Sequence, residues 1–264
     1  MQDLKVTIIQ TDLIWEDKEK NLAHFSEKIA SIKTSSDLIV LPEMFNTAFS
    51  MKPEIFAEKQ DGETIYWLKE KAKETGCVIV GSLMINENGN YFNRMIWMNP
   101  NGSFDYYDKR HLFRMGNEQE HFSAGNENRI INFNGWKFKL MICYDLRFPV
   151  WAKNNYKEGE YDFDCLIYIA NWPAARTNHW KSLLQARAIE NQAYVVGVNR
   201  VGEDGRGTKH CGDSMIFDPQ GNTLLKFEKN SVSMGSSILK FSELENLRNK
   251  FTVGLDWDNF KIYE

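Results

Sequence analysis

Short apolar segments bounded by polar or turn-forming residues recur along the chain, and they restrict its fold more than any other feature. They are LKVTIIQ at residues 4–10, DLIVLPE at 37–43, CLIYIAN at 165–171 and YVVGVNRV at 194–201. Short runs of this kind, rich in Val and Ile, are typical of strands buried within a sheet. None approaches the roughly 18 apolar residues of a transmembrane helix. The chain is therefore predicted to contain buried strands and no membrane span.

Amphipathic segments lie between these strands and predict helices. In residues 17–33, Leu22, Phe25 and Ile29 fall on one helical face. Further helices are expected at residues 62–75, 147–156 and 180–192. Hairpins are expected across residues 77–99, 129–143 and 214–227, each with a turn that contains Asn and Gly.

Helices mixed with hairpins predict an α/β fold whose sheets combine parallel and antiparallel strands. The length of 264 residues fits one large domain. Because no low-complexity linker or internal repeat interrupts the pattern, a single domain over residues 1–264 is expected. The long polar loop at residues 110–128 is a candidate functional segment, because loops of this length in a compact domain often carry function.

Composition excludes several classes of protein. The net charge of -4 gives no electrostatic basis for binding nucleic acid or an anionic membrane surface. The four cysteines, Cys77, Cys143, Cys165 and Cys211, are scattered and form neither a zinc motif nor a disulfide framework. The opening residues MQDLKVTIIQTD lack the basic and apolar regions of a signal peptide. These features together favour a cytoplasmic location.

Three reactive side chains follow predicted strands. Glu43 ends DLIVLPE, Lys109 follows SFDYYD, and Cys143 ends WKFKLMIC. In open α/β sheets, strand ends converge on the functional crevice. A carboxylate can accept the proton of a thiol, and an ammonium can stabilise an anion. If the three side chains meet, they form an acyl-transfer site that needs no histidine.

Residue types alone leave other interpretations open. Glu43 also suits a turn, Lys109 suits exposure to solvent, and Cys143 suits packing at the end of a strand. A phosphatase-like cysteine would need an arginine six positions later, where Pro149 stands. A non-catalytic binding protein of the same fold is a further alternative, although it would be expected to lack one of the three side chains.

A papain-like Cys–His pair is a second enzymatic alternative. The histidines available to it are His24, His111, His121, His179 and His210. None has flanking residues that suggest a general base. His111 is expected to have a structural role, packing or hydrogen bonding near Lys109.

Three sequence blocks, LPEMF, YDKRHLF and ICYDLRFP, occur in this order. Together they resemble the nitrilase superfamily of carbon–nitrogen hydrolases. The likeness extends from VTIIQTDLIWEDKEKN to GDSMIFDPQGN. The segments KRHLFRM, CYDLRFPVW and ANWP occur together in the ω-amidase-like branch, which the chain therefore resembles most.

The resemblance implies a four-layer α-β-β-α sandwich with two mixed β-sheets. It also implies that Glu43 is the general base, Lys109 the group that stabilises the oxyanion, and Cys143 the nucleophile. A second glutamate in the long loop matches Glu118, seven residues before Gly125, rather than Glu120. The N–H of Tyr144 is the expected second oxyanion donor. No metal or organic cofactor is implied.

Substrate recognition is expected beside the cysteine. Arg147 can bind a carboxylate because the guanidinium group matches its geometry; the alternative is a structural ion pair with Asp145. Trp172 is a candidate wall of an apolar pocket, with core packing as the alternative, and Phe45 and Phe148 are weaker candidates. The expected reaction cleaves the terminal amide of a small carboxylate-bearing molecule, such as 2-oxoglutaramate or 2-oxosuccinamate, through a Cys thioester.

Nitrile and N-carbamoyl hydrolysis are alternatives, because the same three residues serve them throughout the superfamily. Members of this superfamily commonly pair into homodimers, so a homodimer is expected here. The aromatic residues near residues 250–264 suit such an interface. Folding of this tail onto its own domain is the alternative.

Overall fold

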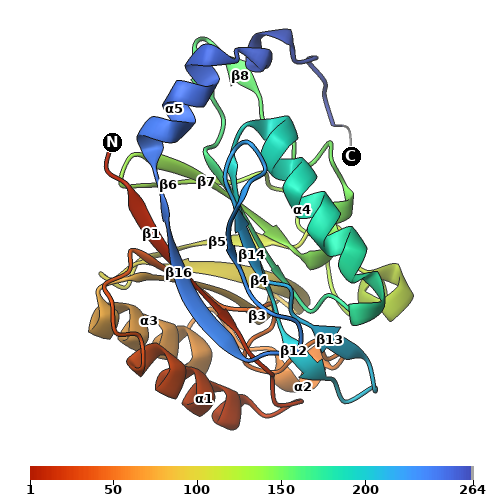
Figure 1. Ribbon diagram of the computed structural model, residues 1–264. Helices are drawn as coiled ribbons and strands as arrows, with labels where there is room; N and C mark the ends of the chain where they lie inside the picture. Colours follow the sequence, from red (N-terminus) through yellow and green to blue (C-terminus); the bar gives the residue numbers. More distant parts are fainter. Residues whose placement is uncertain (263–264) are drawn as a thin grey trace.

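The computed structural model describes residues 1–262 and contains two six-stranded sheets (Figure 1). The first has the order β16 (Ser233–Leu239), β1 (Leu4–Gln10), β2 (Leu38–Val40), β3 (Val78–Glu87), β4 (Asn90–Met98), β5 (Phe104–Asp108). The second has the order β15 (Thr223–Lys226), β14 (Met215–Phe217), β11 (Tyr194–Asn199), β10 (Cys165–Ala170), β7 (Trp136–Ile142), β6 (Ile130–Phe133). Two short pairs stand apart: β8 (Tyr156–Lys157) with β9 (Glu160–Tyr161), and β12 (Val201–Glu203) with β13 (Lys209–Cys211).

Helices cover the outer faces of the two sheets. In Figure 1, α1 (Lys18–Ala30) and α3 (Glu63–Thr75) lie side by side on one outer face, and α4 (Thr177–Asn191) lies on the opposite face. The short α2 (Pro53–Phe56) precedes α3, and α5 (Phe241–Lys250) follows β16 near the N-terminus. This is the four-layer α-β-β-α arrangement that the resemblance implied.

Each sheet is parallel at its centre and antiparallel towards its edges. Strands β1, β2 and β3 run parallel in the first sheet, as do β7, β10 and β11 in the second. The other neighbouring strands in both sheets pair antiparallel. Helical crossovers connect parallel strands and tight turns connect antiparallel ones, so the prediction of mixed sheets is confirmed.

Alternation along the strands of the first sheet produces two apolar layers. Val78 and Val80 belong to the large apolar cluster that includes the second sheet, whereas Ile79 packs under α1 and α3. Successive side chains of a strand point to opposite faces. Gly197 in β11 has a different role, because a Cβ there would collide with Leu184 of α4. The glycine therefore permits close contact between the helix and the second sheet.

Several predicted element ends match the structure. The Asp17 side chain accepts a hydrogen bond from the N–H of Lys20 at 3.0 Å, which caps the start of α1. Gly76 ends α3 with a φ of 69°, in the left-handed region. The Asn134–Gly135 turn joins β6 and β7 with positive φ at both residues. Helix α1 ends at Ala30, earlier than predicted.

The helix predicted at residues 147–156 is wrong. The helical segment lies earlier, as the 3₁₀ helix η3 (Cys143–Arg147), and turns follow it. Downstream, the Asn154 side chain donates to the main-chain carbonyls of Phe163 and Asn191 at 2.9 and 3.1 Å. Side-chain bonds of this kind compete with helix formation.

The C-terminal tail packs partly on its own chain. A 3₁₀ helix covers Val253–Asp256, and Trp257 contacts the edge of the Tyr161 ring at 5.7 Å. Phe251 and Leu255 remain exposed. The predicted interface tail also includes residues 263–264, which lie outside the described residues. Within residues 1–262, no helix is both long and apolar enough to cross a bilayer.

Candidate active site

Glu43, Lys109 and Cys143 follow three different strands and come together in space. Glu43 lies shortly after β2, Lys109 directly after β5, and Cys143 directly after β7. Their exposed fractions are 0%, 1% and 9%. Because β2 and β5 belong to the first sheet and β7 to the second, the site is assembled from both sheets.

Lys109 connects two buried carboxylates. Its Nζ atom lies 3.0 Å from Glu43 Oε1, and 3.0 and 2.9 Å from the two carboxylate oxygens of Glu118. Glu118 is fully buried in a short 3₁₀ turn, whereas Glu120 is exposed. The structure thus places Glu118, and not Glu120, beside Lys109. Charge-assisted bonds on both sides hold the lysine ammonium in one position.

Two asparagines hold Glu43, and sequence reasoning missed the role of both. Asn93 Nδ2 donates to Glu43 Oε1 at 2.8 Å. The main-chain N–H of Asn171 donates to Glu43 Oε2 at 2.7 Å, and its side chain donates to the Glu43 carbonyl at 2.6 Å. Asn171 directly follows β10 within the quoted ANWP motif, which was the available signal. Asn93 lies inside β4, where no local pattern distinguishes it.

Cys143 sits on a tight turn that a neighbouring carboxylate fixes. Its φ of 45° lies in the left-handed region, which costs energy for a residue with a Cβ. Asp145 accepts hydrogen bonds from the N–H of Ile142 at 2.9 Å, the N–H of His111 at 3.0 Å and the hydroxyl of Tyr107 at 2.9 Å. These bonds hold the strained turn, so Asp145 has the structural role expected from the sequence.

His111 has the expected packing and bonding role. Its Nδ1 lies 2.8 Å from Asp145 Oδ1, and its ring stacks on Phe148 with centroids 3.7 Å apart. His111 therefore supports the nucleophile turn from the side of the long loop.

Burial and neighbouring charges shift the pKa values of Cys143, Lys109 and Glu118. Burial raises the pKa of the Cys143 thiol well above its usual value, and Glu43 adds to this effect while Lys109 opposes it. Burial alone would lower the pKa of Lys109, but the Glu118 and Glu43 carboxylates outweigh it and raise that pKa. Burial also raises the pKa of Glu118. The resting site therefore holds a protonated thiol beside a charged lysine, and attack by sulfur requires a base.

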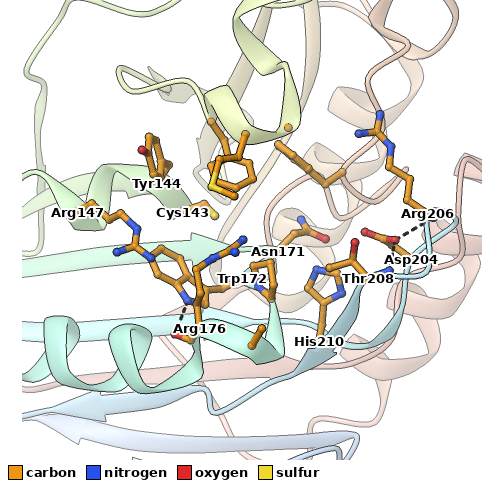
Figure 2. Close-up of a pocket in the computed structure, with 16 residues that line it drawn as sticks. Cys143, Tyr144, Arg147, Asn171, Trp172, Arg176, Asp204, Arg206, Thr208 and His210 are labelled. Atoms are coloured by element: carbon orange, nitrogen blue, oxygen red, sulfur yellow. Dashed lines mark hydrogen bonds between the residues drawn. The ribbon is translucent and has the colours of Figure 1, made fainter.

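A cavity of about 390 Å³ opens onto Cys143 (Figure 2). Cys143, Tyr144 and Arg147 come from the nucleophile turn and Trp172 from the segment after β10. A volume in this range suits a small-molecule ligand. The lysine and the two glutamates are buried and do not line the open space, whereas Tyr144, Arg147 and Trp172 do.

Arg147 does not form the structural ion pair with Asp145 that was the alternative to carboxylate binding. Its guanidinium lies 3.0 Å from His179 Nδ1 and stacks over the Trp172 ring at 4.9 Å. Trp172 is held in turn, because its indole N–H donates to the Arg176 carbonyl at 2.9 Å. Arg147 is thus positioned against the cavity wall with no carboxylate partner among the described residues.

The prediction that Phe45 lines the substrate pocket is wrong. Phe45 is fully buried and packs in the layer under α1 and α3, edge-on to Phe25 with ring centroids 5.5 Å apart. Residues 43–47 form a turn rather than a strand, and Met44 within it has a φ of 45°, so the side chains of Glu43 and Phe45 take different directions although they lie two positions apart. Phe49 and Phe113 supply the aromatic walls of the cavity instead.

The hairpin of β12 and β13 forms the far wall of the cavity. It contributes Asp204, Arg206, Thr208 and His210 (Figure 2). Sequence reasoning did not place this segment at the site, because nothing local shows that the hairpin folds over the cavity. Within residues 1–262, no group of three or more His, Cys, Asp or Glu side chains is arranged to hold a metal ion.

Comparisons with known proteins find similar sequences over most of the chain. The family model described as carbon-nitrogen hydrolase matches residues 5–241. The omega-amidase YafV of Escherichia coli is 41% identical over 263 residues, which cover 100% of both chains. The 2-oxoglutaramate amidase of Bacillus subtilis is 33% identical over 222 residues, covering 83% of this chain and 84% of the relative.

A solved structure extends the likeness to three dimensions. A CN-hydrolase superfamily protein from Xanthomonas campestris, described with an arsenic adduct in its active site, has a TM-score of 0.97 and 37% sequence identity. The match covers 100% of both chains.

Proposed function

Because the chain belongs to the carbon–nitrogen hydrolase family, whose members cleave non-peptide carbon–nitrogen bonds, we propose that it is an ω-amidase with Cys143 as its nucleophile. The substrate is a small acid with a terminal amide, of the 2-oxoglutaramate or 2-oxosuccinamate type, and the products are the diacid and ammonia. The observation that carries this proposal is the buried Glu43–Lys109–Glu118 cluster that interacts with Cys143, together with Arg147 in the cavity that Cys143 lines. The names of the E. coli and B. subtilis relatives support the choice of substrate.

Acylation begins with proton transfer. Glu43 accepts the proton of the Cys143 thiol, which the raised pKa keeps in place until the substrate binds. The sulfur attacks the amide carbon, and the carbonyl π electrons move onto oxygen. An ammonium has three N–H donors, so Lys109 can serve both glutamates and still donate to this oxyanion.

The main chain supplies the second oxyanion donor. Tyr144 is at the start of η3, where N–H groups have no acceptor within the helix. Each such donor typically contributes about a hundred- to a thousand-fold in rate. Glu43 then gives its proton to the amide nitrogen, the carbon–nitrogen bond breaks, and ammonia leaves.

Deacylation reverses these roles. Glu43 takes a proton from water, the hydroxide attacks the thioester carbon, and the carbon–sulfur bond breaks. The proton held by Glu43 returns to the Cys143 sulfur. One base thus serves both half-reactions, which fits its fixed position between Asn171 and Lys109.

Arg147 binds the carboxylate at the other end of the substrate. Its partners are His179 and the Trp172 ring, so ion pairing with the substrate does not require a protein carboxylate to be displaced. Trp172 forms the apolar wall along which the substrate chain lies.

An ammonia-release screen tests the proposal. It covers 2-oxoglutaramate, 2-oxosuccinamate, neutral amides, a nitrile and an N-carbamoyl amino acid at equal concentrations. The expected result is the highest kcat/KM on the 2-oxo acid amides. Preferred hydrolysis of the nitrile or the carbamoyl compound would assign one of those activities instead.

The remaining expectations are also part of this proposal. The chain acts as one domain over residues 1–264, in the cytoplasm, where a reducing environment suits its four unpaired cysteines. It pairs into a homodimer through a surface that includes the exposed Phe251 and Leu255. Sedimentation of the intact protein tests the dimer.

A further inference from the structure

The cavity carries an excess of positive charge. Arg147, Arg176 and Arg206 all line it, and among residues 1–262 none of the three guanidinium groups forms a salt bridge, although Glu16 outside the lining interacts electrostatically with Arg206. The single acid of the lining is Asp204, whose Oδ1 accepts the N–H groups of Arg206 and Thr208 at 2.9 Å each. This contrasts with the net charge of -4 for the whole protein.

The other titratable groups near the cavity do not offset this charge. His210 is neutral at neutral pH, because burial and the charge of Arg200 lower its pKa to about 4. Glu43 and Glu118 are not among the residues that line the cavity, and both accept hydrogen bonds from Lys109. The charge that faces the end of the substrate away from Cys143 is therefore that of the arginines.

Arg176 is fixed in this cavity independently of Arg147. Its carbonyl oxygen accepts the Trp172 indole N–H at 2.9 Å, which anchors its main chain. Its guanidinium lies 5.5 Å from the centre of the Phe113 ring, which also lines the cavity. Figure 2 shows Arg147, Trp172 and Arg176 together at one end of the cavity, near Cys143. Both arginines thus contact the same tryptophan, Arg147 through its guanidinium and Arg176 through its carbonyl oxygen.

We propose that Arg176 is a second substrate-binding arginine, which together with Arg147 binds the carboxylate of the substrate. The same two charges make the enzyme discriminate against α-amino amides such as glutamine. This inference rests on the proposed function. In 2-oxoglutaramate the carbon next to the carboxylate bears an uncharged oxygen, whereas in glutamine it bears an ammonium. An ammonium held between two guanidinium groups in a partly desolvated cavity is strongly disfavoured.

Three amides that differ only at this carbon test the proposal. They are 2-oxoglutaramate, glutaramate and L-glutamine, with the uncharged diamide glutaramide as a fourth substrate. Arg176→Gln is expected to lower kcat/KM for 2-oxoglutaramate and glutaramate by about 10- to 100-fold, through the lost charge-assisted bonds. The preference for 2-oxoglutaramate over L-glutamine is expected to narrow by about tenfold, because the repulsion is also lost.

Arg176→Lys separates charge from geometry. It keeps the charge, so the preference against L-glutamine should persist, but it loses the two-pronged geometry, so KM for the acidic amides should rise. Arg114→Gln is the matched control, since Arg114 is exposed on the neighbouring turn and outside the cavity lining. Turnover of glutaramide should change little in all three variants.

Binding measurements keep the inference separate from the proposed reaction. Calorimetry with the Cys143→Ala protein and intact 2-oxoglutaramate measures affinity without hydrolysis. If the wild type releases no ammonia but this affinity depends on Arg176, the proposed reaction fails and the role of Arg176 stands. Equal losses on acidic amides and glutaramide, or an unchanged preference against L-glutamine in Arg176→Gln, would overturn the role of Arg176.

Discussion

The Nζ atom of Lys109 lies 3.0 Å from Oε1 of Glu43, although 66 residues separate them in the chain. Both side chains are completely buried. The desolvation cost of such a pair is high, and it is offset only when every group has partners. Here Glu118, Asn93 and Asn171 supply them. The arrangement is what a site needs if one carboxylate must exchange protons while a cation stays fixed beside it.

Replacement of Glu43 with Gln removes the base but keeps the shape of the side chain. The rate of acylation is expected to fall by about a hundred- to ten-thousand-fold, because no other group receives the thiol proton. Stability should fall by about 1–3 kcal/mol, since the new amide N–H₂ faces a donor at Asn171 or Lys109. Single-turnover ammonia release and urea unfolding measure the two effects.

Glu58→Gln is the matched control for loss of a buried carboxylate. Glu58 accepts a hydrogen bond from the N–H of Thr64 at 2.8 Å and is not part of the cavity. The Glu58→Gln protein should be less stable than the wild type but should retain its rate of acylation. A Glu43→Gln protein that is as active as Glu58→Gln would remove Glu43 from the mechanism.

Replacement of Lys109 with Met leaves two buried carboxylates without a cation. The expected loss of stability is about 3–5 kcal/mol near neutral pH. Burial already raises the pKa of Glu118, and the ammonium of Lys109 opposes this shift. Without the ammonium the folded variant binds more protons than the unfolded chain, and its stability falls as pH rises. Urea unfolding over a pH series measures this slope.

A second substitution checks the origin of that loss. Lys109→Met combined with Glu118→Gln has one carboxylate fewer, so it should recover part of the stability and show a shallower slope. Simple addition of the two single losses would argue against the electrostatic explanation.

Burial of Lys139 makes the stability of the wild type rise with pH, which is opposite in sign to the effect expected for Lys109→Met. It is buried in β7, its Nζ donates to the Trp151 carbonyl at 2.6 Å, and burial lowers its pKa to about 8. The unfolded chain, with its higher lysine pKa, binds more protons above that value, so stability rises with pH from about 8 until the unfolded lysine also titrates. Lys139→Met should be more stable near neutral pH by about 1–2 kcal/mol.

In Lys139→Met the increase of stability with pH should become smaller but remain, because burial also lowers the pKa of Lys153 to about 8. Lys137→Met on the same strand is the control, since Lys137 is partly exposed and pairs with Glu160. It should leave the pH profile unchanged. An identical response of the Lys137 and Lys139 variants would refute the assignment.

Local strand and hairpin patterns in the sequence predict much of the fold. The four buried strands and the Asn134–Gly135 hairpin follow from local periodicity and turn chemistry. Strand β16 and helix α5 were missed. Strand β16 is rich in Ser and Gly and mostly half-buried, so it lacks a clear apolar alternation. Its pairing with β1 along the full length of both strands is a long-range contact.

Some residues of the site could likewise be predicted from the sequence, and others could not. The ends of predicted strands pointed to Glu43, Lys109 and Cys143, and the resemblance added Glu118. The ANWP motif drew attention to the segment of Asn171, but neither it nor any local pattern at Asn93 shows that the two asparagines hold Glu43, because these contacts join segments far apart in the chain. The prediction for Phe45 failed because position near a reactive residue does not determine which face of a sheet a side chain takes.

Intact-protein mass spectrometry of a rapidly quenched reaction with 2-oxoglutaramate is the most direct test of the account. The account predicts a transient adduct equal to the substrate less ammonia, mapped to the Cys143 peptide and absent from Cys143→Ala. The adduct should appear together with the first equivalent of ammonia and then decay as the acid forms. Ammonia release with no adduct at any time, or with an adduct on a different residue, would contradict the account.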